Sequence, residues 1–320
     1  MASRRLLHII ASLAGLGLFI LLFYRLGPRD ILALLRQIGW GFAGILFIYG
    51  AQLLVRAAAL SHCLPDQSRP RFRELLRVRL IGETIRGLTL TGPFISEPAT
   101  AWLIKKQGVK TSEAAAATIA EYVAHSFVSA FLTILAVMYF RQYTSKIKEL
   151  HVAALVLMYG STAYLAIAAL VLCRRVYFIG SIAMALGHIP GLQRRIGGNL
   201  EQVRRMEDAL LFVLRDRPVV LMRLMALEIT AHALLILETY WAMISMRLNA
   251  SFLTALVAEG MTKLANVALF VGATEGAYAV LFLALGLPAA AGFTLSLLKR
   301  VRSLAIGLIG VGILAAFRRK

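Results

Sequence analysis

Two glutamates lie beside glycine- and proline-rich interruptions of a chain that is otherwise mostly apolar. Glu97 belongs to TGPFISEPATAWLIKK, residues 91–106, and Glu275 belongs to the short segment GATEG. A carboxylate and an irregular backbone are both costly at membrane depth, so they usually lie inside protein or beside a water-filled cavity. Each glutamate could also cap a helix, because the helix dipole favours an acid at that end. We predict that Glu97 and Glu275 bind cationic or hydroxyl groups of a substrate.

Arginine side chains also occur within the apolar runs. Arg56 lies in one predicted span, and Arg300 and Arg302 lie in the last one. An arginine at the centre of a spanning helix costs about 2.5–3.5 kcal/mol on insertion scales, so each one requires an explanation. Arg302 is consistent with a side chain that snorkels to the interface, and Arg56 with an ion pair to a carboxylate of a re-entrant hairpin. We predict that Arg300 faces a cavity, and that Arg56 and Arg300 neutralise an anionic headgroup.

The same five-residue pattern occurs in two predicted helices, as EYVAH at Glu121–His125 and as EITAH at Glu228–His232. Residues four apart share a helix face, so the four side chains could converge on a metal ion. No cysteine joins them, and the internal repeat described below does not relate them. Buried hydrogen-bonded pairs are therefore the preferred interpretation, with a proton relay through either histidine as an alternative. We predict no metal and no other cofactor.

Further charged residues have helical spacing within the apolar sequence. Glu83 follows Arg79 at i,i+4 and precedes Arg86 at i,i+3, so it can pair with either arginine, and Lys263 follows Glu259 at i,i+4. We interpret the Glu259–Lys263 pair as a local salt bridge that lets its helix enter the membrane.

The composition identifies the class of protein. The 320 residues have a mean hydropathy of +0.76 and are 59% hydrophobic, whereas a soluble domain is near half apolar. The net charge of +19 comes from arginines clustered between apolar runs, as the positive-inside rule produces, and no basic domain exists to bind nucleic acid. No G-x-S-x-G, P-loop or H-E-x-x-H motif indicates an enzyme. We predict a polytopic protein of the bacterial inner membrane with both termini in the cytoplasm.

The apolar runs predict an all-α architecture of about six spanning helices. Residues 28–40 predict a short interfacial helix, and Leu200–Leu214 predicts an amphipathic helix within a basic segment. Two pairs of short helices, one on each side of Glu97 and one on each side of Glu275, predict two re-entrant hairpins. The predicted spans are Leu6–Tyr24, Gly41–Ser61, Thr111–Phe140, Leu150–Cys173, Val219–Met246 and Pro288–Phe317.

The arms of the two hairpins can be placed along the chain. The first pair consists of Leu75–Leu90 and a helix that starts at Pro98, with Thr91–Glu97 as the break. The second pair consists of Ser251–Phe270 and Ala277–Leu285.

An internal repeat relates the two short-helix pairs. A shift of 178 residues, which carries Glu97 onto Glu275, also aligns Gly82 with Gly260. Three crossings separate equivalent points, so the repeats are expected to be inverted and to meet at a substrate site near the membrane midplane. The predicted single membrane domain then consists of the first span and interfacial helix (1–40), repeat one (41–140), a linking span and basic segment (150–218) and repeat two (219–316).

Two separated motifs resemble the signatures of the flippase-like family. The first signature has a proline, a glycine-glutamate and an apolar helix that ends in basic residues and glycine, and it is similar to Pro93, Ser96-Glu97 and Leu103 through Gly108. The second signature is similar to Glu275 with Gly286-Leu287-Pro288 and Leu297-Leu298-Lys299-Arg300. The family includes the transmembrane region of bacterial lysylphosphatidylglycerol synthases and stand-alone relatives, some of them associated with hopanoid biosynthesis.

The resemblance implies flipping or transport of a membrane lipid, either a phospholipid or an isoprenoid lipid such as a hopanoid. The sequence holds no soluble synthase domain, so we expect no aminoacyl transfer. The alternatives are a membrane-embedded lipid-modifying enzyme and a scaffold of a lipid-synthesis complex, with lipid-biosynthesis enzymes as partners. The expected substrate-binding residues are Glu97, Glu275, Arg300, Arg56, Pro93 and Glu121, with Arg86, Lys263, Glu228 and His232 in a secondary role.

Overall fold

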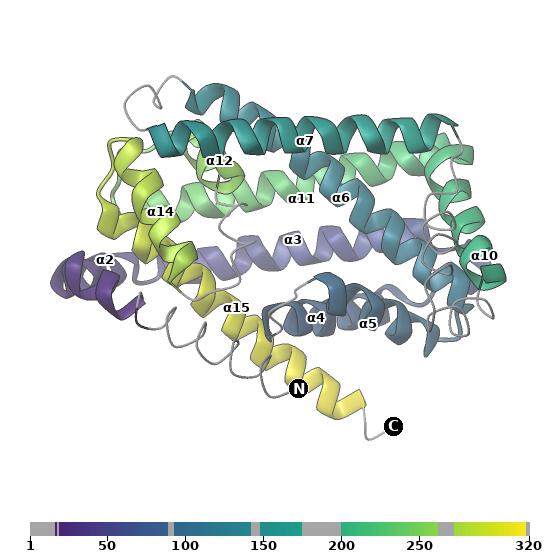
Figure 1. The fold of residues 1–320 in the computed structure, drawn as a ribbon. Helices are drawn as coiled ribbons and strands as arrows, with labels where there is room; N and C mark the ends of the chain where they lie inside the picture. The colour runs from purple at the N-terminus through teal and green to yellow at the C-terminus, as the bar shows by residue number, and fades with distance from the viewer. Residues whose placement is uncertain are drawn as a thin grey trace, which may run out of the picture. The chain divides into compact units, whose positions relative to one another are not determined.

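The structure, a computed structural model of the chain, describes residues 17, 19–88, 93–141, 148–174, 200–261 and 272–317. Every regular element within these ranges is a helix, as Figure 1 shows. The predicted all-α class is therefore confirmed for the described part of the chain.

Four described helices are long and apolar enough to cross a membrane, and they fall on four of the predicted spans. Large apolar side chains point outwards along one of them: Val156 is 56% exposed and Tyr159 is 66% exposed. Such exposure is unfavourable in water and suits contact with lipid. The chain is a multi-pass membrane protein, whose four apolar spanning helices are α3 (Gly41–Cys63), α6 (Thr111–Phe140), α7 (Lys148–Arg174) and α11 (Pro218–Ser245).

The other two predicted spans have different outcomes. The last one corresponds to α15 (Ala289–Phe317), which is 29 residues long and carries Lys299, Arg300 and Arg302 within its apolar sequence. The first one, Leu6–Tyr24, lies mostly outside the described residues. The total of six spans therefore stays a prediction.

The predicted pairs of short helices are present. In the first pair α4 (Phe72–Leu88) packs on α5 (Pro93–Lys105), and in the second pair α12 (Phe252–Met261) packs on α14 (Ala273–Ala284). The connections between them, residues 89–92 and 262–271, lie outside the described residues.

The start of α5 corrects the sequence interpretation. The helix begins at Pro93 instead of Pro98. A proline at the first helical position loses no hydrogen bond, because the N–H there has no intrahelical partner in any case. Pro98 lies inside the helix, where its ring removes a single bond to the carbonyl of Phe94. Glu97 is therefore a helical residue and does not belong to the break.

Two smaller helices also match the sequence. α2 (Pro28–Ile38) follows Gly27, whose φ of 87° is a left-handed conformation that favours glycine. α10 (Leu200–Leu211) continues into a π-helical turn, η4 (Phe212–Asp216). A short 3₁₀ turn, η1 (Asp66–Ser68), precedes α4. Residues 175–199 of the basic segment lie outside the described residues.

The helices recur at the same shift of 178 residues that aligns the two glutamates. Helices α3, α4, α5 and α6, moved by this shift, start within two residues of α11, α12, α14 and α15. The order of span, short helix, short helix and long helix thus occurs twice in the chain.

The chain divides into two compact units, and five helices contribute residues to both. Each unit has its own apolar core: Phe140 and Phe282 are fully buried in unit 1, and Leu75 and Ile104 are fully buried in unit 2. Unit 1 comprises residues 1–51, 131–162 and 233–305, and unit 2 comprises residues 52–130, 163–232 and 306–320.

Close helix packing within unit 1 generates a stability prediction. A Cβ at Gly292 of α15 would overlap the backbone carbonyl of Tyr278 in α14, whereas a Cβ at Gly307 of the same helix meets nothing within 4 Å. We expect Gly292→Ala to lower the free energy of unfolding by about 1–3 kcal/mol, because backbone atoms must shift to admit the methyl group. Thermal unfolding in detergent micelles measures the effect.

Gly307→Ala is the matched control on α15, and its higher helix propensity makes it neutral or slightly stabilising. Equal loss of stability in the two variants would contradict the close approach of α14 and α15.

Candidate functional site

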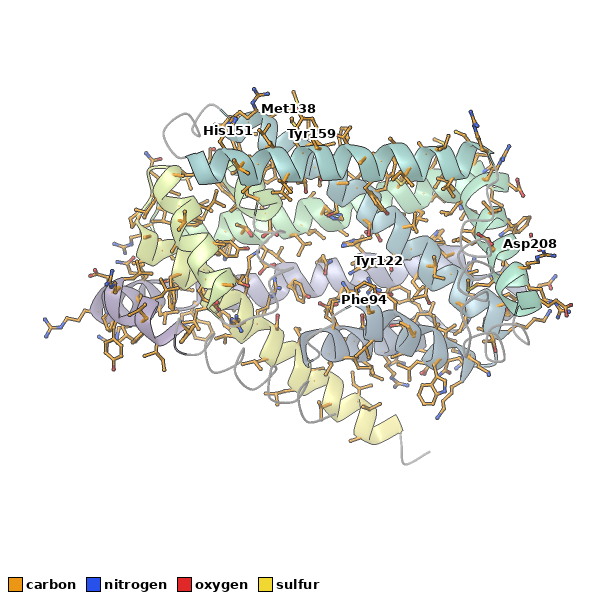
Figure 2. The ribbon with its side chains drawn as sticks, viewed as in Figure 1. Phe94, Tyr122, Met138, His151, Tyr159 and Asp208 are labelled. Carbon is orange, nitrogen blue, oxygen red and sulfur yellow. The ribbon has the colours of Figure 1, made fainter. Side chains whose placement is uncertain are left out.

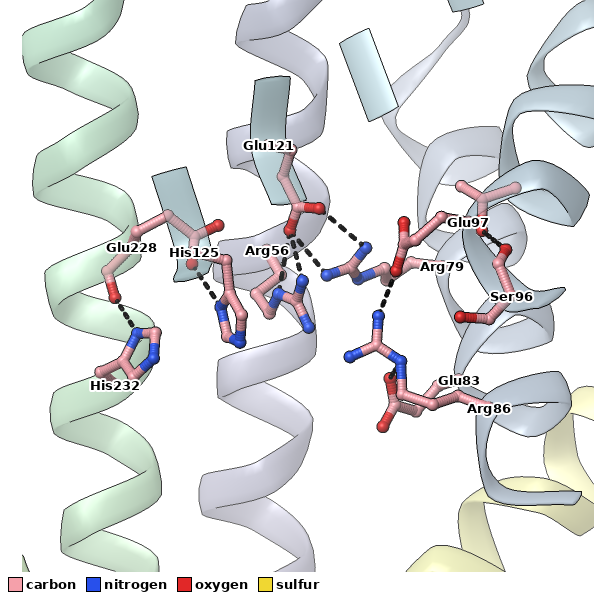
Figure 3. A network of polar contacts seen from close by, with 11 residues as sticks. Arg56, Arg79, Glu83, Arg86, Ser96, Glu97, Glu121, His125, Glu228 and His232 are labelled. Atoms are coloured by element: carbon pink, nitrogen blue, oxygen red, sulfur yellow. Dashed lines mark hydrogen bonds and ion pairs between the residues drawn. The ribbon is translucent and has the colours of Figure 1, made fainter. Parts of the chain in front are cut away.

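Glu121 is the centre of a buried charge network in unit 2, which Figure 3 shows. Its Oε1 accepts hydrogen bonds from Arg56 Nε at 2.9 Å and from Arg56 Nη2 at 2.7 Å. Arg79 donates to the same carboxylate through Nη2 at 2.6 Å and Nη1 at 3.3 Å. All three residues are buried, and they come from α6, α3 and α4 respectively. Arg56 is thus paired with a long helix, which corrects its predicted pairing with a hairpin carboxylate.

Burial explains why these charges are grouped. An isolated ion in the interior of a protein costs several kcal/mol, and the cost is offset only by good geometry and hydrogen bonds. The fully buried Glu228 of α11 belongs to the same group of polar side chains, as Figure 3 shows. The predicted site residues Arg56, Glu121 and Glu228 therefore lie close together in unit 2.

The first hairpin glutamate has a different partner. Glu97 of α5 accepts a hydrogen bond from Arg86 Nη2 of α4, and Arg86 Nε also lies 3.9 Å from Glu83 Oε2. Arg86 and Glu97 keep some exposure, with 22% and 12% of their side chains accessible. The second oxygen of Glu97, Oε2, is buried and has no hydrogen-bond partner among the described residues. Arg86 is therefore a direct partner of the hairpin carboxylate, and Glu97 retains an acceptor that is not used.

A groove of about 550 Å³ runs beside this glutamate. Helices α5 and α6 form most of its wall, with Met206 of α10, and Figure 2 labels Phe94 and Tyr122 among its residues. Most of the surface is apolar, and the charged groups are Glu97 and Lys105. The remaining lining residues are Pro98, Ala101, Trp102, Thr111, Ala115, Thr118 and Ile119. Such a shape suits a hydrocarbon chain attached to a polar group.

Pro93, the other predicted hairpin residue, is placed only through its backbone. It starts α5 one turn before Glu97. Its role is therefore to fix the start of the helix that carries the glutamate.

Unit 1 contains a second charge network. Arg302 of α15 donates to Glu238 of α11, with 2.6 Å between Nη1 and Oε1, and its guanidinium lies 3.7 Å from the centre of the Tyr49 ring. Lys299 of α15 and Thr239 of α11 both donate to Glu259 of α12. Arg302 is buried, so the structure does not place it as a snorkelling side chain. Glu259 pairs with Lys299. The predicted pair of Glu259 with Lys263 stays a prediction, because Lys263 lies outside the described residues.

The two networks use opposite charges at equivalent places. In unit 2 the long helix α6 carries the acid Glu121 and the neighbouring helices carry the bases. In unit 1 the long helix α15 carries the bases Lys299 and Arg302, and α11 and α12 carry the acids. Lys299 occupies the position that corresponds to Glu121 after the shift of 178 residues.

Glu275, the glutamate of the second short-helix pair, both caps a helix and forms an ion pair. Glu275 Oε2 accepts a hydrogen bond from the backbone N–H of Gly272 at 2.8 Å, which closes the start of α14. Its Oε1 accepts from Arg300 Nε. The capping interpretation is therefore confirmed for Glu275. Arg300, which we predicted to face a cavity, is paired with this carboxylate and keeps 39% of its side chain exposed.

The two Glu-x-x-x-His patterns meet, although the partners differ from those predicted. His125 Nδ1 lies 2.8 Å from Glu228 Oε2, and His232 Nδ1 lies 2.9 Å from the backbone oxygen of Glu228. The two imidazole rings have their centres 4.4 Å apart. Glu121 instead binds the arginines, so the side-chain pair forms between α6 and α11, and the contact within the second pattern is to the backbone oxygen of Glu228.

Several members of the networks were missed from the sequence. Arg79, Glu238 and Lys299 were not among the predicted site residues, although Glu238 and Lys299 are charges within apolar helices. That placement was the available signal. Their partners come from other helices, and spacing along one helix does not identify them.

The shared carboxylate of Glu121 generates a prediction. Glu121→Gln leaves Arg56 and Arg79 buried without their carboxylate, so we expect a loss of about 3–5 kcal/mol in the free energy of unfolding. Glu74→Gln is the control, because Glu74 pairs with Arg77 at 2.7 Å on the exposed side of α4. An exposed pair contributes about 0–1 kcal/mol. Thermal unfolding of the two variants in detergent compares these costs, and similar losses would argue against the buried network.

The family of the chain follows from comparison with known proteins. The sequence profile described as the lysylphosphatidylglycerol synthase TM region matches residues 8–310. No curated protein and no solved structure matches the chain. The matched range includes all the residues of both charge networks, and the family indicates a membrane-lipid-related function for the chain. Hopanoid-associated membership stays a prediction. The chain belongs to the family of the lysylphosphatidylglycerol synthase transmembrane region.

Proposed function

We propose that this protein moves a membrane lipid between the two leaflets of a bacterial inner membrane, without changing the lipid chemically. The observation that carries the proposal is the apolar groove of about 550 Å³ beside Glu97. Its wall includes Glu97, whose Oε2 is buried and has no hydrogen-bond partner among the described residues. An apolar groove with a few polar groups is the usual form of a site for an amphiphilic ligand.

The groove suggests how the two parts of a lipid are accommodated. Phe94, Trp102 and Ile119 offer apolar contact to an acyl or isoprenoid chain. Glu97 Oε2 offers an acceptor to an ammonium or hydroxyl group of the headgroup. A polar headgroup then crosses the apolar region while bound to protein, which lowers the cost of its desolvation.

The ion pair between Glu97 and Arg86 supplies a way to release the lipid. Both side chains are partly accessible. A charged headgroup therefore takes the place of Arg86 beside Glu97, or the place of Glu97 beside Arg86. We propose that the headgroup competes with Arg86 for the carboxylate during passage. Glu275 and Arg300 in unit 1 form a second such pair, and the 39% exposure of the Arg300 side chain makes it available to an anionic phosphate.

The roles of the more deeply buried charges differ. Arg56 is 2% exposed and is held by Glu121, so we assign both residues to positioning α3, α4 and α6 around the groove. This assignment replaces the earlier expectation that Arg56 contacts the headgroup directly.

Leaflet exchange of a fluorescent lipid in liposomes tests the carboxylates. Loss of a charge-assisted hydrogen bond costs about 1.5–3 kcal/mol, so we expect Glu97→Gln, Glu275→Gln and Arg300→Ala each to slow exchange roughly 10- to 100-fold. Glu113→Gln is the control, because Glu113 contacts Ser68 at 3.1 Å and Lys110 at 3.7 Å, away from the groove lining.

Unchanged exchange in all three variants would remove the assigned site. A lipid species that is missing from a deletion strain would instead favour a lipid-modifying enzyme, because transport alone leaves the lipid inventory unchanged.

The volume of the groove provides a separate test. Ala101→Trp places an indole in the groove, and we expect it to slow leaflet exchange at least as much as Glu97→Gln while the protein stays folded. Val156→Trp on the exposed face of α7 adds the same bulk outside the groove and serves as the control. Exchange that is equally fast in both variants would show that the lipid does not use this groove.

Sided labelling tests the predicted inversion of the two repeats. Single cysteines at Gln107 and Leu287, in a background where Cys63 and Cys173 are serine, are expected to react from opposite sides of the membrane. Both positions follow the second short helix of a pair. Labelling from the same side would contradict inverted repeats and would require a different count of crossings.

A further inference from the structure

Three side chains that can ligate metals meet in unit 2. His125 of α6 and Glu228 and His232 of α11 each bring a ligand atom within 4.8 Å of the others. Figure 3 shows them beside Arg56, next to the network of Glu121. Glu228 is fully buried and His232 is 5% exposed, so the cluster is shielded from solvent. The lipid groove does not include any of the three residues.

The hydrogen bond of His232 fixes which ring nitrogen carries the proton. Its Nδ1 lies 2.9 Å from the backbone oxygen of Glu228, and a carbonyl oxygen only accepts. Nδ1 must therefore be the donor, and in the neutral ring Nε2 carries the lone pair. Metal-binding histidines characteristically donate their other N–H to a carbonyl or a carboxylate in this way.

His125 is placed to bind through its other ring nitrogen, Nδ1. This atom lies 2.8 Å from Glu228 Oε2, so a metal ion that contacts both atoms takes the place of the proton they share. The rings of His125 and His232 are tilted by 34°, with their centres 4.4 Å apart, and both belong to the same small cluster.

The other oxygen of Glu228 is an independent sign of a ligand. Glu228 Oε1 is buried and has no hydrogen-bond partner among the described residues. A buried acceptor without a partner loses its hydration and forms no hydrogen bond in return. A cation beside this oxygen removes that cost.

We propose that His125, Glu228 and His232 bind a first-row transition-metal dication of the Zn²⁺ type. Two imidazole nitrogens and one carboxylate oxygen suit zinc and similar ions, whereas Ca²⁺ and Mg²⁺ prefer oxygen ligands throughout. The proposal is independent of lipid translocation, since it rests on the cluster alone.

The neighbouring charges restrict what completes the site. Arg56 and Arg79 share the single carboxylate of Glu121, so a dication beside them adds further positive charge. Three protein ligands leave one position of a tetrahedral zinc site for water or another ligand. A hydroxide or another anionic oxygen in that position offsets part of the added charge.

Metal titration of the full-length protein tests the proposal. The chain, purified in detergent with a tag that contains no histidine, is stripped with a chelator and titrated with Zn²⁺ by calorimetry, with elemental analysis after dialysis. We expect one Zn²⁺ per chain. Loss of an outer-shell partner of a metal site costs about 10- to 100-fold in affinity, so removal of a ligand in His232→Gln or Glu228→Gln is expected to weaken binding at least 100-fold.

The control is His62→Gln. His62 Nδ1 lies 2.8 Å from the backbone oxygen of Ala58, the same local hydrogen bond that His232 makes, and it lies outside the cluster. We expect this variant to bind Zn²⁺ as the wild type does. Equal binding by the wild type and both cluster variants would overturn the proposal, because the metal would then be held elsewhere.

The wild type alone also decides the question, which matters if a cluster variant fails to fold. Co²⁺ in a tetrahedral site of two nitrogens and a carboxylate is expected to give intense visible absorption bands, and Zn²⁺ is expected to remove them. If the wild type binds neither ion in stoichiometric amount, the cluster is a hydrogen-bonded one without metal.

Discussion

The cost of placing charge in an apolar interior governs this structure. Glu121 is shared by Arg56 and Arg79, and these residues connect the long helices α3 and α6 with the short helix α4. Removal of Glu121 leaves two buried guanidinium groups without their carboxylate, and the cost of such unpaired buried charges exceeds the net stabilisation that an ion pair contributes. The network therefore fixes the relative placement of three helices, and the groove formed by α5 and α6 depends on that placement because α5 packs on α4.

The second network shows that the arrangement does not depend on the sign of the charges. Unit 1 uses Lys299 and Arg302 on its long helix with Glu238 and Glu259 on the neighbouring helices. The attraction between opposite charges is the same when the two partners exchange helices. Corresponding helices of the two units are thus joined by ion pairs in the same way, with the acidic and basic residues on opposite helices. A comparison of residue types alone therefore understates the similarity of the two repeats.

The buried carboxylates of the described residues differ in whether both of their oxygens have hydrogen-bond partners. Glu121 has hydrogen bonds to both of its carboxylate oxygens. Glu97 and Glu228 each keep one buried oxygen without a partner among the described residues, and they belong respectively to an apolar groove and to a histidine cluster. A buried carboxylate oxygen without a hydrogen bond is costly. A ligand that bonds to such an oxygen therefore stabilises the protein more than a ligand at a carboxylate whose oxygens are already bonded.

The sequence by itself determined the helical class, four of the spans, the short-helix pairs and the family. Those features follow from apolar run length, from Gly and Pro interruptions and from two motifs, all of which are local along the chain. It did not determine the partners of the charges: Arg56 and His125 find theirs on α6 and α11, at separations of 65 and 103 residues. Helical spacing restricts which face a side chain occupies, but which faces meet is decided by packing between helices, and only the tertiary structure supplies that.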